Sequence, residues 1–146
     1  MIHSAGIIPF RFNPSTGELE YFVGHPGGMS AEYYAFLKGQ TNKGENTVEA
    51  AIREFLEESG AIVPDDVFDS LIPLGSVMQN PMKRVTAFGL PYGDINEEKC
   101  YSNLCDNGYT PEIDKYAWLT YDELRKITHP SHLIFYEQIK TIALSK

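Results

Sequence analysis

The sequence predicts an α/β or α+β sandwich, in which helices pack on a mixed β-sheet. Strand-like and helix-like segments alternate along its 146 residues, without internal repeats or low-complexity linkers. The hydrophobic content of 42% is enough for the core of one domain but hardly for two. We therefore expect a single domain that spans residues 1–146.

The first strands are predicted from runs of apolar, β-forming residues. Residues 5–12 form the first of them, and Pro9 suggests a sheet edge or a bulge because proline has no N–H to donate. A turn at 13–17 contains Asn, Pro and Gly, so residues 19–23 are expected to return as the second strand of a hairpin. The next elements are a loop at 25–32 and a short strand candidate at 33–37.

The second half of the chain supplies the other strands and two more helices. Its expected elements are strands at 71–78 and 84–90, a loop-like stretch at 91–111, a short strand at 115–119, and helices from about residues 121 and 131. These strands complete the mixed sheet.

Residues 47–59 form the clearest helix of the sequence. Asn46 and Glu49 resemble a capping box at its start, and Gly60 stands where a helix end favours positive φ. Apolar residues recur at i, i+3, i+4 and i+7, and we expect this face to point toward the core. The face consists of Val48, Ala51, Ile52 and Phe55.

Glu54, Glu57 and Glu58 share a face of the same helix, roughly opposite the apolar stripe. Like charges at these spacings repel each other. A bound cation would relieve the repulsion, and carboxylate oxygens suit Mg²⁺ or Mn²⁺. Three glutamates alone are more often a solvated surface. Their spacing from neighbouring residues is what favours a metal site.

The glutamates belong to a longer pattern, whose seven fixed residues are Gly39, Glu45, Arg53, Glu54, Glu57, Glu58 and Gly60. The pattern resembles the box of the Nudix hydrolase (MutT-like) family, G-x5-E-x7-R-E-U-x-E-E-x-G-U, where U is a bulky aliphatic residue. Phe55 and Ala61 depart from it at the two U positions, which concern packing rather than metal chemistry. The resemblance implies the α/β/α Nudix sandwich, with the box as a loop–helix–loop that binds metal ions.

The resemblance also implies roles for the box residues. Glu54, Glu57 and Glu58 would bind one to three Mg²⁺ (or Mn²⁺) ions, helped by a backbone carbonyl near Lys38 or Gly39. The metal would lower the pKa of a bound water and set it in line with the phosphate to be cleaved. The pair of Glu45 and Arg53 would fix the helix against its loop.

A carboxylate must accept the proton of the attacking water. Within the family this base comes either from the box, here Glu54 or Glu57, or from a later loop. We prefer Glu112 among the later acids because it stands before the expected strand 115–119 in an E-x5-W pattern similar to that of the family. The other later candidates are Asp114, Glu98 and Glu97.

Candidate substrate-binding residues are aromatic or basic. Tyr34, together with Tyr33 and Phe36, lies just before the box and could stack on a base, although such aromatics are more often core residues. Phosphate oxygens would be met by basic side chains. The candidates for that contact are Arg11, Lys38, Lys83 and Arg84.

The N-terminal residues 4–11 and 18–25 look like the start of asymmetric diadenosine polyphosphate hydrolases. Leu37-Lys38-Gly39 is similar to the Pro-Lys-Gly that precedes the box there. This resemblance implies hydrolysis of a phosphoanhydride bond in a dinucleoside polyphosphate. ADP-ribose and nucleoside triphosphates stay open as substrates, as does a Nudix domain that senses nucleotides without cutting them. Isomerisation of isopentenyl diphosphate fits less well, because Cys100 and Cys105 lie in a polar, loop-like stretch.

Composition excludes several classes of function. A formal charge of −8 argues against extended nucleic acid as a partner. No leader and no apolar run of about 18 residues is present, which argues against secretion and a membrane span. Two cysteines outside a C-x-x-C arrangement fit a reduced cytoplasm. We expect a cytoplasmic protein, either a monomer or a homodimer, with a small nucleotide as its partner.

Overall fold

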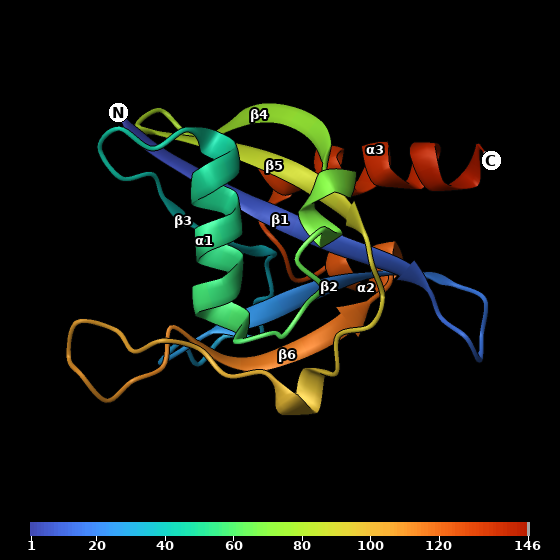
Figure 1. Cartoon of the computed structure of the whole chain (residues 1–146), viewed down its shortest axis with the longest axis horizontal. Coiled ribbons are helices and arrows are strands. Elements are labelled where there is room, and N and C mark those ends of the chain that lie inside the picture. Colours follow the sequence, from blue (N-terminus) through green and yellow to red (C-terminus); the bar gives the residue numbers. More distant parts are fainter. Residues whose placement is uncertain (146) are drawn as a thin grey trace.

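The computed structural model describes residues 1–145, which form a six-stranded mixed sheet with helices on both faces (Figure 1). The strands are β1 (Ile2–Phe12), β2 (Leu19–Pro26), β3 (Leu37–Gln40), β4 (Ile72–Asn80), β5 (Lys83–Pro91) and β6 (Ile113–Leu119). The α-helices are α1 (Thr47–Ser59), α2 (Tyr121–Leu124) and α3 (Leu133–Leu144). Three short 3₁₀ helices are η1 (Val67–Ser70), η2 (Glu97–Lys99) and η3 (Pro130–His132). The predicted fold class is confirmed. No helix within residues 1–145 is long and apolar enough to cross a membrane.

Alternation along β1 assigns the two helical layers to opposite faces of the sheet. Ile7 packs in one core cluster with Ala51 and Phe55 of α1. Its neighbour Ile8 packs in the other cluster with Phe135 of α3. Each face of the sheet is therefore buried under its own helix.

Strand β1 is the central strand, and its partners explain an unexpected proline. β1 runs parallel to β5 along most of its length. On its other edge it pairs with β3 over residues 4–7 and with β2 over residues 10–12. Pro9 was predicted to mark a sheet edge or a bulge, but it lies within this central strand, where β1 changes partner. A residue without an N–H fits such a break in the ladder.

The short strand predicted at 33–37 is displaced in the structure. Residues 33–36 make only one bridge, between Ala35 and Gly24, and the strand itself begins at Leu37. Aromatic residues favoured the earlier position through their β propensity, but the ladder with β1 forms where Lys38 and Gly39 meet Ala5 and Gly6. Tertiary pairing overrode local preference here.

Helix α1 begins and ends at the predicted residues. The Asn46–Glu49 capping box is complete, and Gly60 takes a φ of +60° while its N–H bonds to the carbonyl of Leu56. Its buried face differs from the predicted one and consists of Ala50, Ala51, Phe55, Glu58 and Ser59. Val48 is 40% exposed and lies outside this buried face.

This rotation of the buried face predicts opposite results for two aspartate substitutions in α1. Ala51→Asp would bury an unpaired carboxylate in a fully buried position and should cost several kcal/mol of unfolding free energy. Val48→Asp should change stability by less than about 1 kcal/mol, since an acidic residue suits the first turn of a helix. Urea unfolding followed by circular dichroism measures both. Equal destabilisation would contradict the observed orientation of α1.

Candidate functional site

Arg53 is the centre of a network that ties α1 to the preceding loop. Its Nε lies 2.8 Å from Oε2 of Glu45, and its Nη2 lies 3.0 Å from Oε1 of the same carboxylate. Nη2 also donates to the carbonyl oxygen of Gln40, at 2.9 Å. The hydrogen bonds from Arg53 and from the backbone of Asn42 lower the pKa of Glu45 to about 2. The structure thus brings the predicted pair of Glu45 and Arg53 together, and its two hydrogen bonds link α1 to the loop before it.

The same guanidinium reaches two of the predicted metal ligands. Nη1 of Arg53 donates to Glu54 at 2.8 Å and to Glu57 at 3.3 Å. The carboxylate of Glu54 lies directly over the Cα of Gly39, so closely that a Cβ on Gly39 would overlap its atoms. Glycine at position 39 therefore makes room for the Glu54 carboxylate against β3.

Glu58 is buried, which corrects the expectation that it lies on the solvent side of α1. It is only 7% exposed, and its Oε1 has no hydrogen-bond partner among residues 1–145. Burial and the charge of Glu54 raise the pKa of Glu58 to about 8, against the opposing effect of Lys38. Burial also raises the pKa of Glu54. The positive charges of Arg53 and Lys38 thus offset only part of the cost of ionising these two neighbouring carboxyl groups.

The segment between η2 and β6 folds back onto the C-terminal end of α1. The N–H of Tyr101 donates to the carbonyl of Ser59 at 3.0 Å, and that of Asn103 donates to the carbonyl of Glu57 at 2.9 Å. The hydroxyl of Tyr116 donates to the carbonyl of Glu58. These donors satisfy carbonyls that a helix end leaves free. They also fix the segment beside the glutamates.

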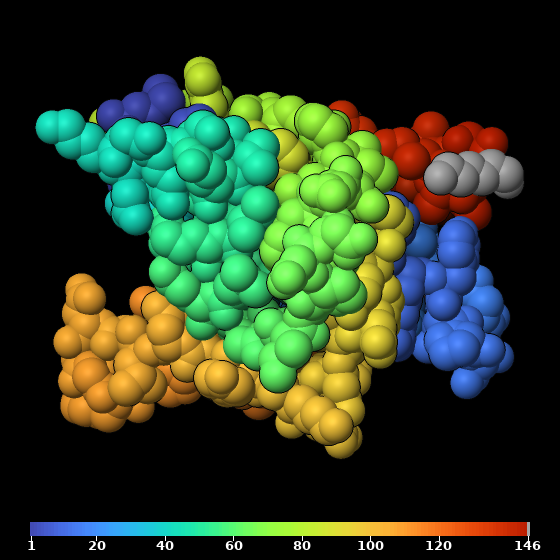
Figure 2. Space-filling view, in the orientation of Figure 1, coloured from blue at the N-terminus to red at the C-terminus, as the bar shows by residue number. Residues whose placement is uncertain are grey.

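This docking brings Glu112 to the box. Its N–H donates to the carbonyl of Asn103 at 2.9 Å, and its charge raises the pKa of both Glu54 and Glu58. Figure 2 shows a hollow between the green surface of α1 and the orange surface of the segment that ends at Glu112. The charges of Glu57 and Glu112 act on Glu54, and those of Glu54 and Glu112 act on Glu58, so these four carboxylates are neighbours.

The other acids considered as bases are engaged elsewhere. Asp114 lies 2.7 Å from Nδ1 of His25. Glu97 and Glu98 belong to η2 and line a small surface pocket with Arg11. Of the later acids, Glu112 is the one whose charge acts on two of the box glutamates.

The four predicted phosphate-binding residues do not all lie in one place. Lys38 and Lys83 lie close enough that the charge of Lys83 adds to burial in lowering the pKa of Lys38 to about 8. Arg84 follows Lys83 in β5 and so points to the opposite face of the sheet. The structure keeps the two lysines together and places Arg84 apart.

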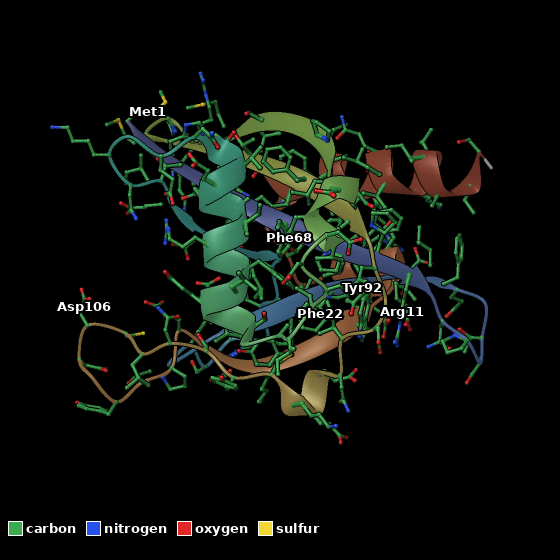
Figure 3. The ribbon with its side chains drawn as sticks, viewed as in Figure 1. Met1, Arg11, Phe22, Phe68, Tyr92 and Asp106 are labelled. Atoms are coloured by element: carbon green, nitrogen blue, oxygen red, sulfur yellow. The ribbon has the colours of Figure 1, made fainter. Side chains whose placement is uncertain are left out.

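The structure does not bring Arg11 to the box. It stands six residues along β1 from Ala5, the partner of Gly39, or about 20 Å away. Its Nη2 lies 3.0 Å from Glu20, and its guanidinium lies over the Trp118 ring at 4.3 Å. Figure 3 shows Arg11 on the far side of the molecule from the segment labelled at Asp106. Arg11 thus belongs to a structural cluster.

Tyr34, the predicted stacking residue, packs against one of the two core clusters and also lines a pocket. It is partly buried, and its ring lies edge-on to the His25 ring at 5.6 Å. The pocket has a volume of about 610 Å³. It is also lined by Lys115 from β6 and by Lys126 beyond α2.

Comparison with known proteins agrees with this arrangement. Residues 20–139 match the NUDIX domain. The chain belongs to the NUDIX family. None of the curated proteins matches the sequence significantly.

Solved Nudix structures share its fold. An Ap4A hydrolase from C. elegans, in a binary complex, has a TM-score of 0.67 and 17% identity, over 98% of this chain and 99% of that one. The NUDIX domain of Shewanella oneidensis NrtR, complexed with ADP ribose, has a TM-score of 0.68 and 10% identity, over 98% and 88% of the two chains. A Nudix hydrolase from Listeria monocytogenes has a TM-score of 0.66 and 18% identity, over 95% and 94%. Family membership and a complete box place the chain among the Nudix pyrophosphohydrolases.

The Nudix box fits a divalent cation in its chemistry. Within residues 1–145 no three His, Cys, Asp or Glu side chains are arranged so that they could hold a metal ion as they stand, and Glu54 and Glu57 are bonded to Arg53. The unpaired Oε1 of Glu58 and the raised pKa values of Glu54 and Glu58 nevertheless indicate carboxylates that a cation would stabilise. The residues present fit Mg²⁺ or Mn²⁺.

Two features of this Nudix site were missed in the sequence. The alternation of β6 could have placed Tyr116 on the same face as Trp118, toward α1, but its bond to the Glu58 carbonyl depends on tertiary folding. The contact of His25 with Asp114 joins residues 89 positions apart and has no local sequence signal.

Proposed function

We propose that this Nudix protein hydrolyses a phosphoanhydride bond in a nucleoside diphosphate linked to a further group, with dinucleoside polyphosphates as the leading substrates. The observation that carries the proposal is that Glu57 and Glu112 act by charge on Glu54, and Glu54 and Glu112 on Glu58, which is buried with an unpaired oxygen. Such a cluster suits metal-assisted attack on a diphosphate.

The roles of the residues follow from their positions. Glu54, Glu57 and Glu58, with the backbone near Gly39, would hold Mg²⁺ or Mn²⁺. A divalent ion bound there would neutralise charge on the phosphate oxygens and lower the pKa of the water that it binds. Glu112, whose charge acts on Glu54 and Glu58, accepts the proton of the attacking water.

Binding of the substrate would involve the two lysines and the neighbouring pocket. Lys38 and Lys83 contact the phosphates, and substrate anions would favour the protonated form of Lys38. The pocket beside Tyr34, at about 610 Å³, has room for the nucleoside end of a substrate. Its aromatic wall offers a stacking surface, and Lys115 and Lys126 offer positive charge.

The fold likeness to the Ap4A hydrolase and the ADP-ribose complex directs the choice of compounds to test. Two free cysteines, Cys100 and Cys105, agree with the proposed cytoplasmic location.

The test is a panel of nucleotides incubated with Mg²⁺, with products resolved by chromatography. The panel contains diadenosine tetraphosphate, ADP-ribose, NADH and the common nucleoside triphosphates. We expect metal-dependent cleavage, fastest for diadenosine tetraphosphate and lost on chelation. Preference for ADP-ribose would replace the leading substrate. Binding of nucleotides without any cleavage would overturn hydrolysis in favour of a sensor.

A further inference from the structure

His25 makes two hydrogen bonds that require its charged form. The ring is buried at 7% exposure, near the end of β2. Its Nδ1 lies 2.7 Å from Oδ1 of Asp114, and its Nε2 lies 2.9 Å from the carbonyl oxygen of Ala31. Neither a carboxylate nor a carbonyl oxygen can donate a proton, so both ring nitrogens must be donors. A ring with two N–H groups is an imidazolium cation.

These two bonds join the loop Gly27–Tyr34 to the start of β6. Ala31 belongs to this loop, which forms a wall of the pocket beside Tyr34. Few other bonds hold the loop. At its ends, Gly27 donates to the carbonyl of Glu112 at 2.8 Å, and Tyr34 donates to the carbonyl of Ile127 at 3.1 Å. In the middle of the loop, the links to β2 are the bond from His25 to Ala31 and a longer bond, at 3.4 Å, from the N–H of Met29 to the carbonyl of Pro26.

We propose that His25 is a positioning residue, whose imidazolium form holds the loop Gly27–Tyr34 closed as the wall of the nucleoside pocket. The use of this wall by substrate rests on the proposed function. When His25 loses one proton, the remaining one stays on Nδ1, because the bond to the Asp114 carboxylate is the stronger of the two. Nε2 then presents a lone pair to the carbonyl of Ala31, and the loop is released.

Several charged groups lie around His25, and Asp114 is the one that contacts its ring. Asp114 from β6 is in direct contact with the ring, and the hydroxyl-bearing ring of Tyr34 packs against it at 5.6 Å. The other charged groups around the pocket are Glu32 of the loop, Lys115 of β6, Glu123 of α2 and Lys126. These are two cations and two anions, and of the charged groups named here Asp114 is the one in contact with the ring.

The loop should therefore be closed while the ring carries two N–H groups, and it should be released when a rise in pH removes one of them. In the metal-free protein, ¹⁵N NMR of the ring nitrogens should show two protonated nitrogens at low pH and loss of the Nε2 proton first. Amide exchange in the loop should accelerate over the same pH interval. With substrate, KM for diadenosine tetraphosphate should rise about tenfold over that interval, which is the size expected for the loss of one charged hydrogen bond. The pH dependence of kcat should not show this step.

Three variants complete the experiment. His25→Gln has its donors on one nitrogen and an acceptor oxygen at the other end, so it should show fast loop exchange and a high KM at every pH, without the step. Asp114→Asn should move the step to lower pH, because the carboxylate charge is gone. His129→Gln is the matched control and should keep the wild-type step. Circular dichroism confirms that each variant is folded.

The outcomes separate this inference from the proposed function. A ring that carries one proton at all pH values, or loop exchange and KM that ignore its charge, would overturn the positioning role. Coupled ring and loop signals in a protein that cleaves none of the nucleotides would support the His25 link and overturn only the proposed hydrolysis.

Discussion

Glu58→Gln is expected to reduce hydrolysis by about 10³-fold and yet to make the metal-free protein more stable at pH 8. Loss of a metal-binding carboxylate removes several kcal/mol of transition-state stabilisation. Glutamine has nearly the same shape, so the packing of this buried position is kept. It carries no charge, and so removes the cost of ionising a buried carboxyl group.

The pH dependence of stability gives this prediction its sign. The pKa of Glu58 is raised to about 8 in the folded protein, from the ordinary value of 4.5. The folded state therefore binds a proton that the unfolded state has released, and stability falls as pH rises from about 4.5 to about 8. In the variant this part of the slope should vanish. Thermal unfolding in EDTA, from pH 5 to pH 9, measures it.

Two comparisons make the Glu58 result specific. Glu49→Gln lies on the same helix and keeps its capping box, so it should leave both activity and the pH slope unchanged. Mg²⁺ should raise the melting temperature of wild type at pH 8 and do so much less in Glu58→Gln. Full turnover in the Glu58 variant would remove this residue from the metal site.

The sequence predicted what local rules determine. The bounds of α1 follow from the Asn46–Glu49 box and from Gly60, which are local signals, and they proved correct. The box pattern predicted that Glu54, Glu57 and Glu58 lie close to one another, since all three belong to one helix. It also predicted the Glu45–Arg53 pair that the structure brings together.

What the sequence could not supply depends on contacts between distant segments. The burial of Glu58 arises because β3 and the segment before β6 cover the end of α1, and neither contact has a local signal. Arg11 was a reasonable phosphate ligand by charge alone, but its residue type does not say how far it lies from the box in the folded protein. Val48 was predicted to be buried but is exposed, because periodicity along the helix does not say which of its residues the sheet covers.

Gly39→Ala is expected to reduce metal affinity and activity by about 10- to 100-fold while costing little stability. A Cβ at this position would overlap the carboxylate of Glu54. That carboxylate is the end of a flexible side chain, so it can move aside without disturbing the backbone. The fold therefore tolerates the substitution, whereas the geometry of the metal site does not. Titration with Mn²⁺ followed by electron paramagnetic resonance, beside urea unfolding, measures both effects.

A second substitution tests this explanation for Gly39. Glu54→Asp in the Gly39→Ala protein shortens the side chain by one carbon and should recover part of the lost Mn²⁺ affinity, although Glu54→Asp alone should weaken it. The coupling between the two changes is the evidence that they share one space. Gly27→Ala is the contrasting control, because its Cβ would meet the backbone carbonyl of Pro111 and should destabilise the fold itself. Simple addition of the effects of Gly39→Ala and Glu54→Asp would show that Gly39 acts by some route other than making room for the carboxylate.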